Sequence, residues 1–109
     1  MIRSSVIEDL KQLAVLLGLV AQGTEWHLFG SVNRDEIDAS DIDLMILCKS
    51  DAQADMLRQA IDPDSLSLPL HLAFLTFDEA AAIGATCVQQ STVILRVDSW
   101  LDCQNSPVH

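Results

Sequence analysis

The chain has 109 residues, and 6 basic against 16 acidic side chains give it a formal net charge of −10. This length suits one domain, so we expect residues 1–109 to form a single domain with a polar tail from about residue 102. Half of the residues are hydrophobic, which is enough to bury a core. Because a charge of −10 repels phosphate groups, we expect no stable binding of nucleic acid or of an anionic membrane by this chain alone.

The cysteines and the N-terminal segment predict a cytoplasmic location. The three cysteines are widely spaced: Cys48, Cys87 and Cys103. They contain no C-x-x-C pair, so the spacing is that of neither a zinc site nor a disulfide framework, and Cys48 and Cys87 are expected to be core thiols. The apolar run 13–20 is too short to span a bilayer, and acidic residues precede it where a signal peptide carries positive charge.

The first predicted element is an amphipathic helix over residues 4–22. Ser5 and Glu8 match a capping box at its start, and Gly18 or Gly23 is expected to end it. Apolar residues recur at spacings of three and four, as on the core-facing side of a helix. These residues are Val6, Leu10, Leu13, Leu17 and Val20.

Four strands and two more helices are predicted after this helix. A strand over 26–29 ends at a Gly-Ser turn, and a polar loop leads to a strand over 41–48. That second strand begins with alternating acidic and apolar residues and becomes continuously apolar, so its second half is expected to be buried on both faces. The remaining predictions are a helix over 51–61, a strand over 70–77, a helix over 78–88 and a strand over 92–97. This order predicts an α/β (α+β) fold, in which helices cover one mixed sheet.

The sequence also predicts the positions of two individual side chains, His27 and Met56. His27 is expected on the sheet face opposite Leu28, as a surface residue rather than a ligand. In the helix over 51–61, the inner face is expected to include Met56 together with Ala54, Leu57 and Ile61.

Asp41 and Asp43 form the first half of a candidate site. Alternate residues of a strand share a face, so these carboxylates project the same way about 6.6 Å apart along the strand. Ile42 and Leu44 are then expected to point into the core. Two like charges held in this way repel unless a cation lies between them, and oxygen ligands suit Mg²⁺ or Mn²⁺.

Gly30 and Ser31 form the second half. Glycine lets a backbone approach a ligand closely, and successive N–H groups at a turn or helix start can bind a phosphate. A phosphate-binding turn beside a pair of carboxylates is the arrangement of a metal–nucleotide site. Each half is a weak signal alone, but the order and spacing of the two halves between apolar runs are more specific.

The segments 28–31 (Leu-Phe-Gly-Ser) and 40–44 (Ser-Asp-Ile-Asp-Leu) resemble the signature of the DNA polymerase β-type nucleotidyltransferase superfamily, particularly its minimal members. The resemblance covers residues from about 5 to 77 by element order, and its diagnostic residues lie in 28–44. It implies a polymerase β-like fold, and transfer of a nucleoside monophosphate from a nucleoside triphosphate, with ATP expected, to a hydroxyl group. It also implies Mg²⁺ or Mn²⁺ at Asp41 and Asp43, catalysis by these two residues with His71, and nucleotide or phosphate binding by Gly30, Ser31, Arg34 and Ser40.

The sequence departs from the family pattern in two places. Many minimal members continue with Arg-x-Arg-Gly after the Gly-Ser pair; here Arg34 matches the second arginine, while Val32 and Asp35 replace the first arginine and the glycine. The family also has a third acid on a later strand, whose counterpart here is His71. Three roles remain open for His71: a hydrogen-bonded structural residue, a neutral general base, or a metal ligand that shifts the preference towards Mn²⁺ or Zn²⁺.

Three functions are compatible with the sequence. The leading hypothesis is a metal-dependent nucleotidyltransferase that modifies a protein or small-molecule hydroxyl. Short family members often pair with a separate helical protein, including as the antitoxin half of toxin–antitoxin modules, so a helical partner or a homodimer is expected. The alternative is a catalytically degenerate binding or regulatory module that lacks the third carboxylate. A plain α/β domain with an accidental motif is the third hypothesis.

Overall fold

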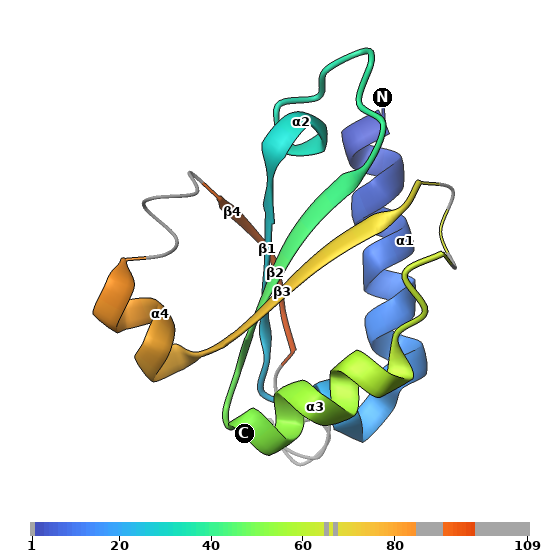
Figure 1. The fold of residues 1–109 in the computed structure, drawn as a ribbon. Helices are drawn as coiled ribbons and strands as arrows, with labels where there is room; N and C mark the ends of the chain where they lie inside the picture. The colour runs from blue at the N-terminus through green and yellow to red at the C-terminus, as the bar shows by residue number, and fades with distance from the viewer. Residues whose placement is uncertain (1, 65, 67, 85–90, 98–109) are drawn as a thin grey trace, which may run out of the picture.

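The computed structural model describes residues 2–64, 66, 68–84 and 91–97 (Figure 1). The elements follow the predicted order, with a short additional helix after the first strand. They are α1 (Ile2–Leu17), the 3₁₀ turn η1 (Gly18–Ala21), β1 (Glu25–Phe29), α2 (Gly30–Asn33), β2 (Ile42–Cys48), α3 (Asp51–Ala60), β3 (Leu70–Thr76), α4 (Phe77–Ile83) and β4 (Thr92–Arg96). The predicted mixed sheet with helices is confirmed.

The four strands form one sheet in the order β3-β2-β1-β4. β1 runs antiparallel to both of its neighbours, β2 and β4, whereas β2 and β3 are parallel. A parallel pair needs a crossover connection, and α3 supplies it. The two central strands are therefore held on both sides, and the N-terminal end of β2 lies beside the N-terminal end of β3.

The two faces of the sheet are covered by different helices, α1 and α3 on one face and α4 on the other (Figure 1). On one face, Leu28 and Leu44 are fully buried in the main core, which also contains residues of α1 and α3 such as Leu10 and Leu57. On the other face, a smaller cluster is centred on Met45 and Leu47 of β2 and Ala80 of α4. The strand over 41–48 is thus buried on both faces in its second half, as predicted.

The first helix differs from its prediction at the N-terminus. Val6 and Leu10 are buried as expected, and the α-helix ends at Leu17, before Gly18. The capping box was wrong: because the helix begins at Ile2, its proposed residues lie inside the first turns. The carboxylate of Asp35 instead accepts a hydrogen bond from the backbone N–H of Arg3 at 3.1 Å. A distant residue therefore satisfies an N–H group of the first turn, which local sequence cannot indicate.

Two further side-chain predictions can be compared with the structure. Met56 is 51% exposed, so its place on the inner face of α3 was wrong; Ala54 and Leu57 supply that face. Cys48 is fully buried, and burial raises the pKa of its thiol to about 11, which confirms a core cysteine. Cys87, the predicted helix beyond residue 84 and the tail from residue 102, including Cys103, lie outside the described residues. Within the described part of the chain, no helix is long and apolar enough to cross a membrane.

Candidate functional site

Asp43 stands on β2 between two partner residues. It is in register with Phe29 of β1 on one side and with His71 of β3 on the other. Ile42, the preceding residue, is 1% exposed and anchors the start of the strand in the core, as predicted. Asp41 lies directly before the strand. The sheet therefore fixes the position of Asp43 more firmly than that of Asp41.

The structure brings His71 to both carboxylates. Its Nε2 atom lies 3.4 Å from Oδ2 of Asp41, and its Nδ1 atom lies 4.0 Å from Oδ1 of Asp43. The imidazole side chain is 61% exposed, whereas those of Asp41 and Asp43 are 35% and 26% exposed. The three predicted catalytic residues thus form one group at the surface, with the ring on the solvent side of two partly buried carboxylates.

The electrostatics of this group disfavour the charged form of Asp43. Burial raises the pKa of its carboxyl group, and the nearby charge of Asp41 raises it further. His71 and Arg34 act in the opposite direction, but the pKa remains above its ordinary value. A cation placed between the two carboxylates would reduce the repulsion between their charges.

Position 30 requires glycine for two reasons, its backbone conformation and its close approach to Asp43. Its φ angle is +74°, in the left-handed region that favours glycine. A Cβ atom at this position would lie 2.1 Å from Oδ2 of Asp43, far inside van der Waals contact. The glycine of the motif therefore lets the turn after β1 approach the carboxylate directly. This approach places the predicted phosphate-binding turn against the predicted metal ligand.

Ser31, Arg34 and Ser40 are the other predicted phosphate-binding residues. Ser31 follows Gly30 in α2, and its carbonyl accepts a hydrogen bond from the N–H of Glu36 at 3.0 Å. The side chain of Arg34 is 62% exposed and pairs with Glu36 at 2.5 Å, although its charge still acts on Asp43. Ser40 is exposed in the loop before β2. Arg34 would have to leave Glu36 to reach a phosphate.

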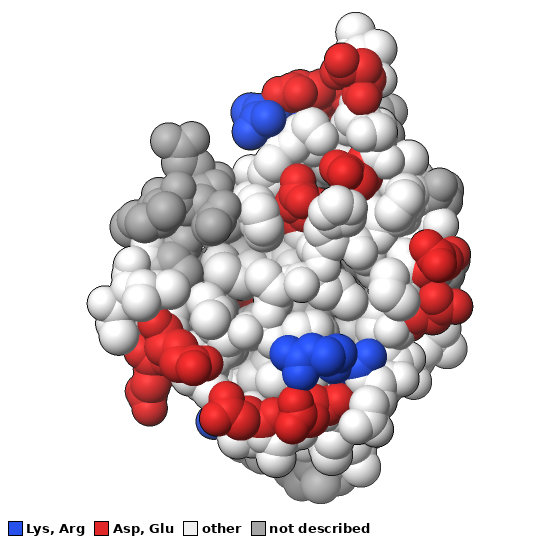
Figure 2. All heavy atoms as spheres, in the orientation of Figure 1, with Lys and Arg blue, Asp and Glu red and all other residues white. Residues whose placement is uncertain are grey.

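Acidic side chains gather at this end of the molecule, over α2 and the loop that leads to β2 (Figure 2). Asp35 in this loop has a φ angle of +56°. The family pattern has glycine at this position, and aspartate is among the few other residues that adopt left-handed backbone. Asp35 can therefore adopt this backbone conformation, and it supplies the carboxylate that caps α1.

The donor set fits a cation that is also held by its substrate. Among the described residues, no group of three or more His, Cys, Asp and Glu side chains is arranged to hold a metal ion. Mg²⁺ typically uses only one or two protein carboxylates and completes its coordination with substrate phosphates and water. Asp41 and Asp43 supply those two carboxylates.

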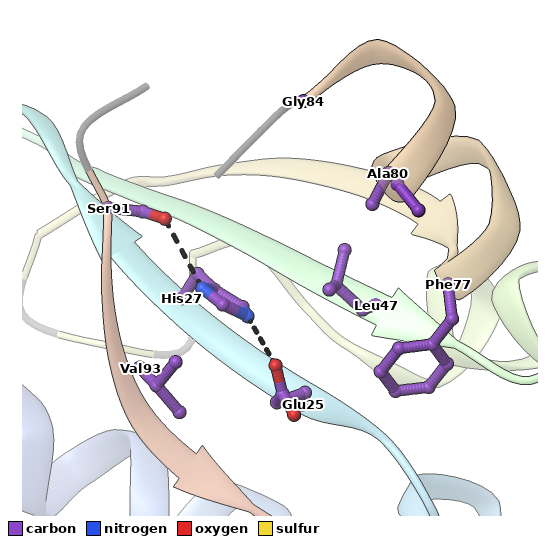
Figure 3. A pocket seen from close by; sticks show the side chains of 9 residues that line it. Glu25, His27, Leu47, Phe77, Ala80, Gly84, Ser91 and Val93 are labelled. Carbon is purple, nitrogen blue, oxygen red and sulfur yellow. Dashed lines mark hydrogen bonds and ion pairs between the residues drawn. The ribbon is translucent and has the colours of Figure 1, made fainter. Parts of the chain in front are cut away.

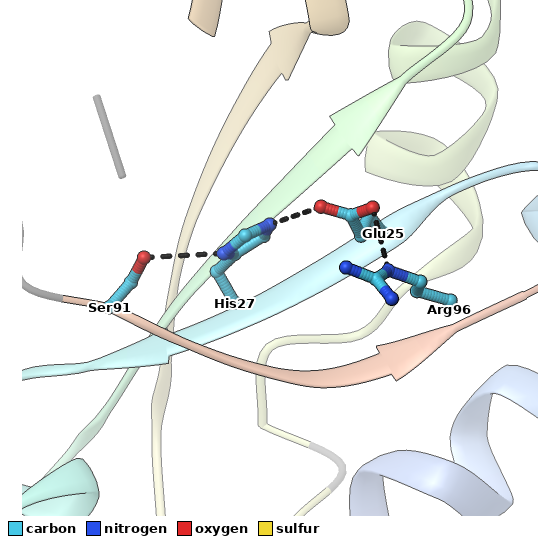
Figure 4. A network of polar contacts seen from close by, with 4 residues as sticks. All are labelled: Glu25, His27, Ser91 and Arg96. Carbon is cyan, nitrogen blue, oxygen red and sulfur yellow. Dashed lines mark hydrogen bonds and ion pairs between the residues drawn. The ribbon is translucent and has the colours of Figure 1, made fainter. Parts of the chain in front are cut away.

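A second polar group on the same sheet was not predicted as a unit (Figure 4). His27 bridges two residues: Nε2 lies 2.8 Å from Oε1 of Glu25, and Nδ1 lies 3.2 Å from Oγ of Ser91. Arg96 donates from Nε to Oε2 of Glu25 at 3.0 Å. His27 is on the face opposite Leu28, as predicted, but it is only 3% exposed, so its assignment to the surface was wrong.

The Glu-x-His spacing could have indicated part of this group, because residues i and i+2 of a strand share a face. Arg96 lies on β4 and Ser91 directly precedes that strand. Both residues reach this group because β4 pairs with β1. No local pattern in the sequence predicts that pairing.

Comparison of the chain with protein families, with curated proteins and with solved structures found no match. Evidence for a function therefore comes from the motif and from the geometry that surrounds Asp43.

Substitution of Gly30 tests the contact with Asp43. We expect Gly30→Ala to lower the free energy of unfolding by about 3 kcal/mol, because it combines a left-handed backbone with a steric clash. Gly18→Ala is the matched control: its φ is +60°, but a Cβ there meets nothing within 4 Å, so only the backbone cost of about 1–2 kcal/mol applies. In urea unfolding, the loss in Gly30→Ala should shrink by at least about 1 kcal/mol when Asp43→Ala is also present. Additive effects would contradict the contact.

The raised pKa of Asp43 predicts a pH dependence of stability. A carboxyl group whose folded pKa lies above its unfolded value favours the folded state when protonated, and this contribution is lost as the pH rises through the folded pKa. The stability of the wild type relative to Asp43→Asn should therefore fall between about pH 3 and pH 7 in the presence of a chelator. Urea unfolding of both proteins across this range measures it. If the stability of the wild type relative to Asp43→Asn increased with pH, folding would favour the ionised form of Asp43.

Proposed function

We propose that this protein is a metal-dependent nucleotidyltransferase with a polymerase β-like fold. One observation carries the proposal: Asp41, Asp43 and His71 meet at one end of the sheet, where the backbone of Gly30 touches the Asp43 carboxylate. This arrangement joins the two halves of the motif, which are separated in sequence by a polar loop. A triphosphate bound at Gly30 and Ser31 would bring its phosphates directly to the two carboxylates.

Each residue has a distinct role in the proposed reaction. Asp41 and Asp43 would hold Mg²⁺ or Mn²⁺, which would neutralise charge on the triphosphate and on the leaving pyrophosphate. Gly30 and Ser31 would let the phosphates approach the backbone, and Arg34 and Ser40 would contribute to binding the same phosphates. The acceptor hydroxyl oxygen bonds to the α-phosphorus, the bond from this phosphorus to the β-phosphate bridging oxygen breaks, and pyrophosphate leaves. The hydroxyl proton passes to His71, whose imidazole can accept a proton.

The expected acceptor is a hydroxyl of a protein or of a small molecule, with ATP as the nucleotide donor. A charge of −10 disfavours a nucleic-acid acceptor held by this chain alone. By resemblance to short family members, we propose that the chain acts in the cytoplasm with a separate helical protein or as a homodimer, and that an antitoxin-like role in a two-protein module is one form of this arrangement.

The second candidate function is a binding or regulatory module that retains the site without turnover. One observation favours it: β3 contains no acidic residue, and His71 occupies the position beside Asp43. Such a module would still bind a metal–triphosphate complex through Asp41 and Asp43 but would not transfer the nucleoside monophosphate.

Asp43→Asn tests the site that both candidates share. We expect it to weaken Mn²⁺-dependent ATP binding by at least about 100-fold and to abolish any transfer of label from ATP radiolabelled at the α-phosphate, because a carboxylate ligand is lost. Calorimetry measures the binding. Asp55→Asn is the control, since Asp55 is an exposed acid on α3 whose ion pair with Arg58 is a surface interaction. Equal loss in both variants would indicate a general effect of negative charge and would exclude this site.

Substitution of His71 separates the two candidate functions. His71→Asp adds a third carboxylate and should tighten Mn²⁺ binding by about tenfold or more. His71→Asn keeps a similar polar shape without a group that accepts a proton. If the wild type transfers label and His71→Asn does not, while both bind ATP, the enzyme is supported; if the wild type binds ATP but transfers no label, the binding module is supported. No effect of His71→Asp on metal binding would remove His71 from the site.

A further inference from the structure

A cavity of about 650 Å³ lies against the sheet beside α4 (Figure 3). This volume is within the usual range for small-molecule sites. Glu25, His27 and Ser91 all line the cavity, and the two dashed lines in Figure 3 join them in series. The cavity therefore brings together a serine hydroxyl, an imidazole and a carboxylate.

The sheet fixes these three side chains relative to one another. Glu25 and His27 are two residues apart on β1, so their side chains share a face. Ser91 directly precedes β4, whose first residue, Thr92, pairs with Leu28 of β1. His27 pairs with both neighbouring strands and is only 3% exposed, so its ring has little freedom to turn.

The hydrogen bonds assign a different role to each side chain. Burial raises the pKa of the Glu25 carboxyl group, but hydrogen bonds with His27 and Arg96 outweigh this effect, and the pKa lies below its ordinary value. Glu25 is therefore a carboxylate near neutral pH, and it accepts from Nε2 of His27 at 2.8 Å. In the neutral ring, Nδ1 is then unprotonated and accepts from the hydroxyl of Ser91 at 3.2 Å.

This series has the connectivity of a nucleophile, a general base and a carboxylate that positions the base. In the Ser-His-Asp triad the serine contacts Nε2 and the carboxylate contacts Nδ1, whereas the two nitrogens are exchanged here. The exchange preserves the proton path, because a neutral imidazole has one donor and one acceptor in either tautomer. Arg96 donates to the second oxygen of Glu25 at 3.0 Å, so both carboxylate oxygens are held.

The walls of the cavity favour a neutral, apolar substrate group. Leu47, Phe77 and Val93 line it, and Phe77 and Val93 are each 38% exposed. Among the described lining residues, Glu25 is the only acidic or basic side chain apart from His27, and its charge is paired with Arg96. An apolar acyl group would bury part of this exposed surface.

We propose that Ser91 is a nucleophile that takes up the acyl group of a neutral carboxylic ester, with His27 as its general base and Glu25 as a positioning residue. Oγ of Ser91 bonds to the ester carbonyl carbon while the hydroxyl proton passes to Nδ1 of His27. The bond from this carbon to the alcohol oxygen then breaks, His27 gives the proton to that oxygen, and the alcohol leaves. Water releases the acyl group as a carboxylic acid through the same proton transfers.

An alkyl fluorophosphonate tests the nucleophile, because an activated serine oxygen displaces its fluoride and keeps the phosphonyl group. We expect peptide mass spectrometry to find this label on Ser91 of the wild type and not on Ser5, an exposed serine of α1. The wild type should also release p-nitrophenol from p-nitrophenyl butyrate. Ser91→Ala should abolish labelling and ester cleavage, whereas Ser5→Ala should retain both. An unlabelled Ser91, or equal labelling of Ser5, would overturn the proposal.

His27→Gln tests the general base. The amide keeps a polar side chain but cannot take up a proton, so the rate of labelling should fall by at least about 100-fold in a variant that circular dichroism shows to be folded. An unchanged rate would remove His27 from the reaction. Because His27 is buried, NMR of the wild-type ring supplies a measurement without substitution. The neutral ring should carry its hydrogen on Nε2; a hydrogen on Nδ1 would overturn the assigned roles.

Glu25→Gln tests the positioning residue. Loss of the negative charge should increase the population of the tautomer with hydrogen on Nδ1 of His27 and slow labelling by at least about tenfold. Slower labelling without a change of tautomer would overturn the positioning role of Glu25. These experiments contain neither a metal ion nor a triphosphate, so their outcome is independent of the proposed nucleotidyl transfer.

Discussion

The alternation of side chains along β2 is the constraint on which the rest of the structure depends. Ile42, Leu44 and Ile46 are at most 1% exposed and belong to the core that includes α1 and α3. Because successive side chains point to opposite faces, the pairing that buries these three residues also fixes Asp43 on the other face. A slip of one residue would turn these three side chains away from that core and turn the carboxylate of Asp43 towards it. Burial of the hydrophobic core thus determines the face of the sheet on which the carboxyl group of Asp43 lies.

Near that carboxylate, the fold holds together groups that would separate in a flexible chain. The turn at Gly30 is pressed against Asp43 in a backbone conformation that other residues avoid, and Asp41 adds a like charge. Local costs of this kind persist only where the surrounding structure imposes them, and they concentrate at functional sites. Here the imposing structure is the sheet, since Asp43 pairs on both sides with neighbouring strands.

The sequence predicts those parts of the fold that depend on local periodicity. The alternation of 41–48 and the helical spacing of Val6 and Leu10 predicted burial correctly, because each reports which side of one element faces the core. The cap of α1 could not be predicted, because Asp35 reaches it from 32 residues away. His27 was misplaced for the same reason: its burial depends on Ser91 and on strand β4, a pairing over 64 residues.

In the candidate site, too, local sequence features were predicted and contacts between distant residues were not. The motif predicted that Gly30 and Asp43 belong together, and the structure adds the reason in their direct contact. The position of His71 beside both carboxylates was predicted only through the family resemblance, and the parallel pairing of β2 and β3 supplies its physical basis. Arg34 illustrates the opposite case, since matching the family pattern did not predict that Glu36 would hold its side chain.

In the proposed function, histidine at position 71 would separate the binding of a nucleotide from its transfer. With a third carboxylate the site would present three negative charges to an incoming triphosphate, whereas Asp41 and Asp43 present two. Fewer cations are then needed to balance the complex, so binding with a single Mg²⁺ or Mn²⁺ becomes less costly. The proposed transfer step would lack a third carboxylate, and the imidazole of His71 would take the hydroxyl proton in its place. In the proposed function, retained binding would therefore not imply turnover: binding would depend on Asp41 and Asp43, and turnover would depend on whether the exposed ring of His71 reaches the acceptor.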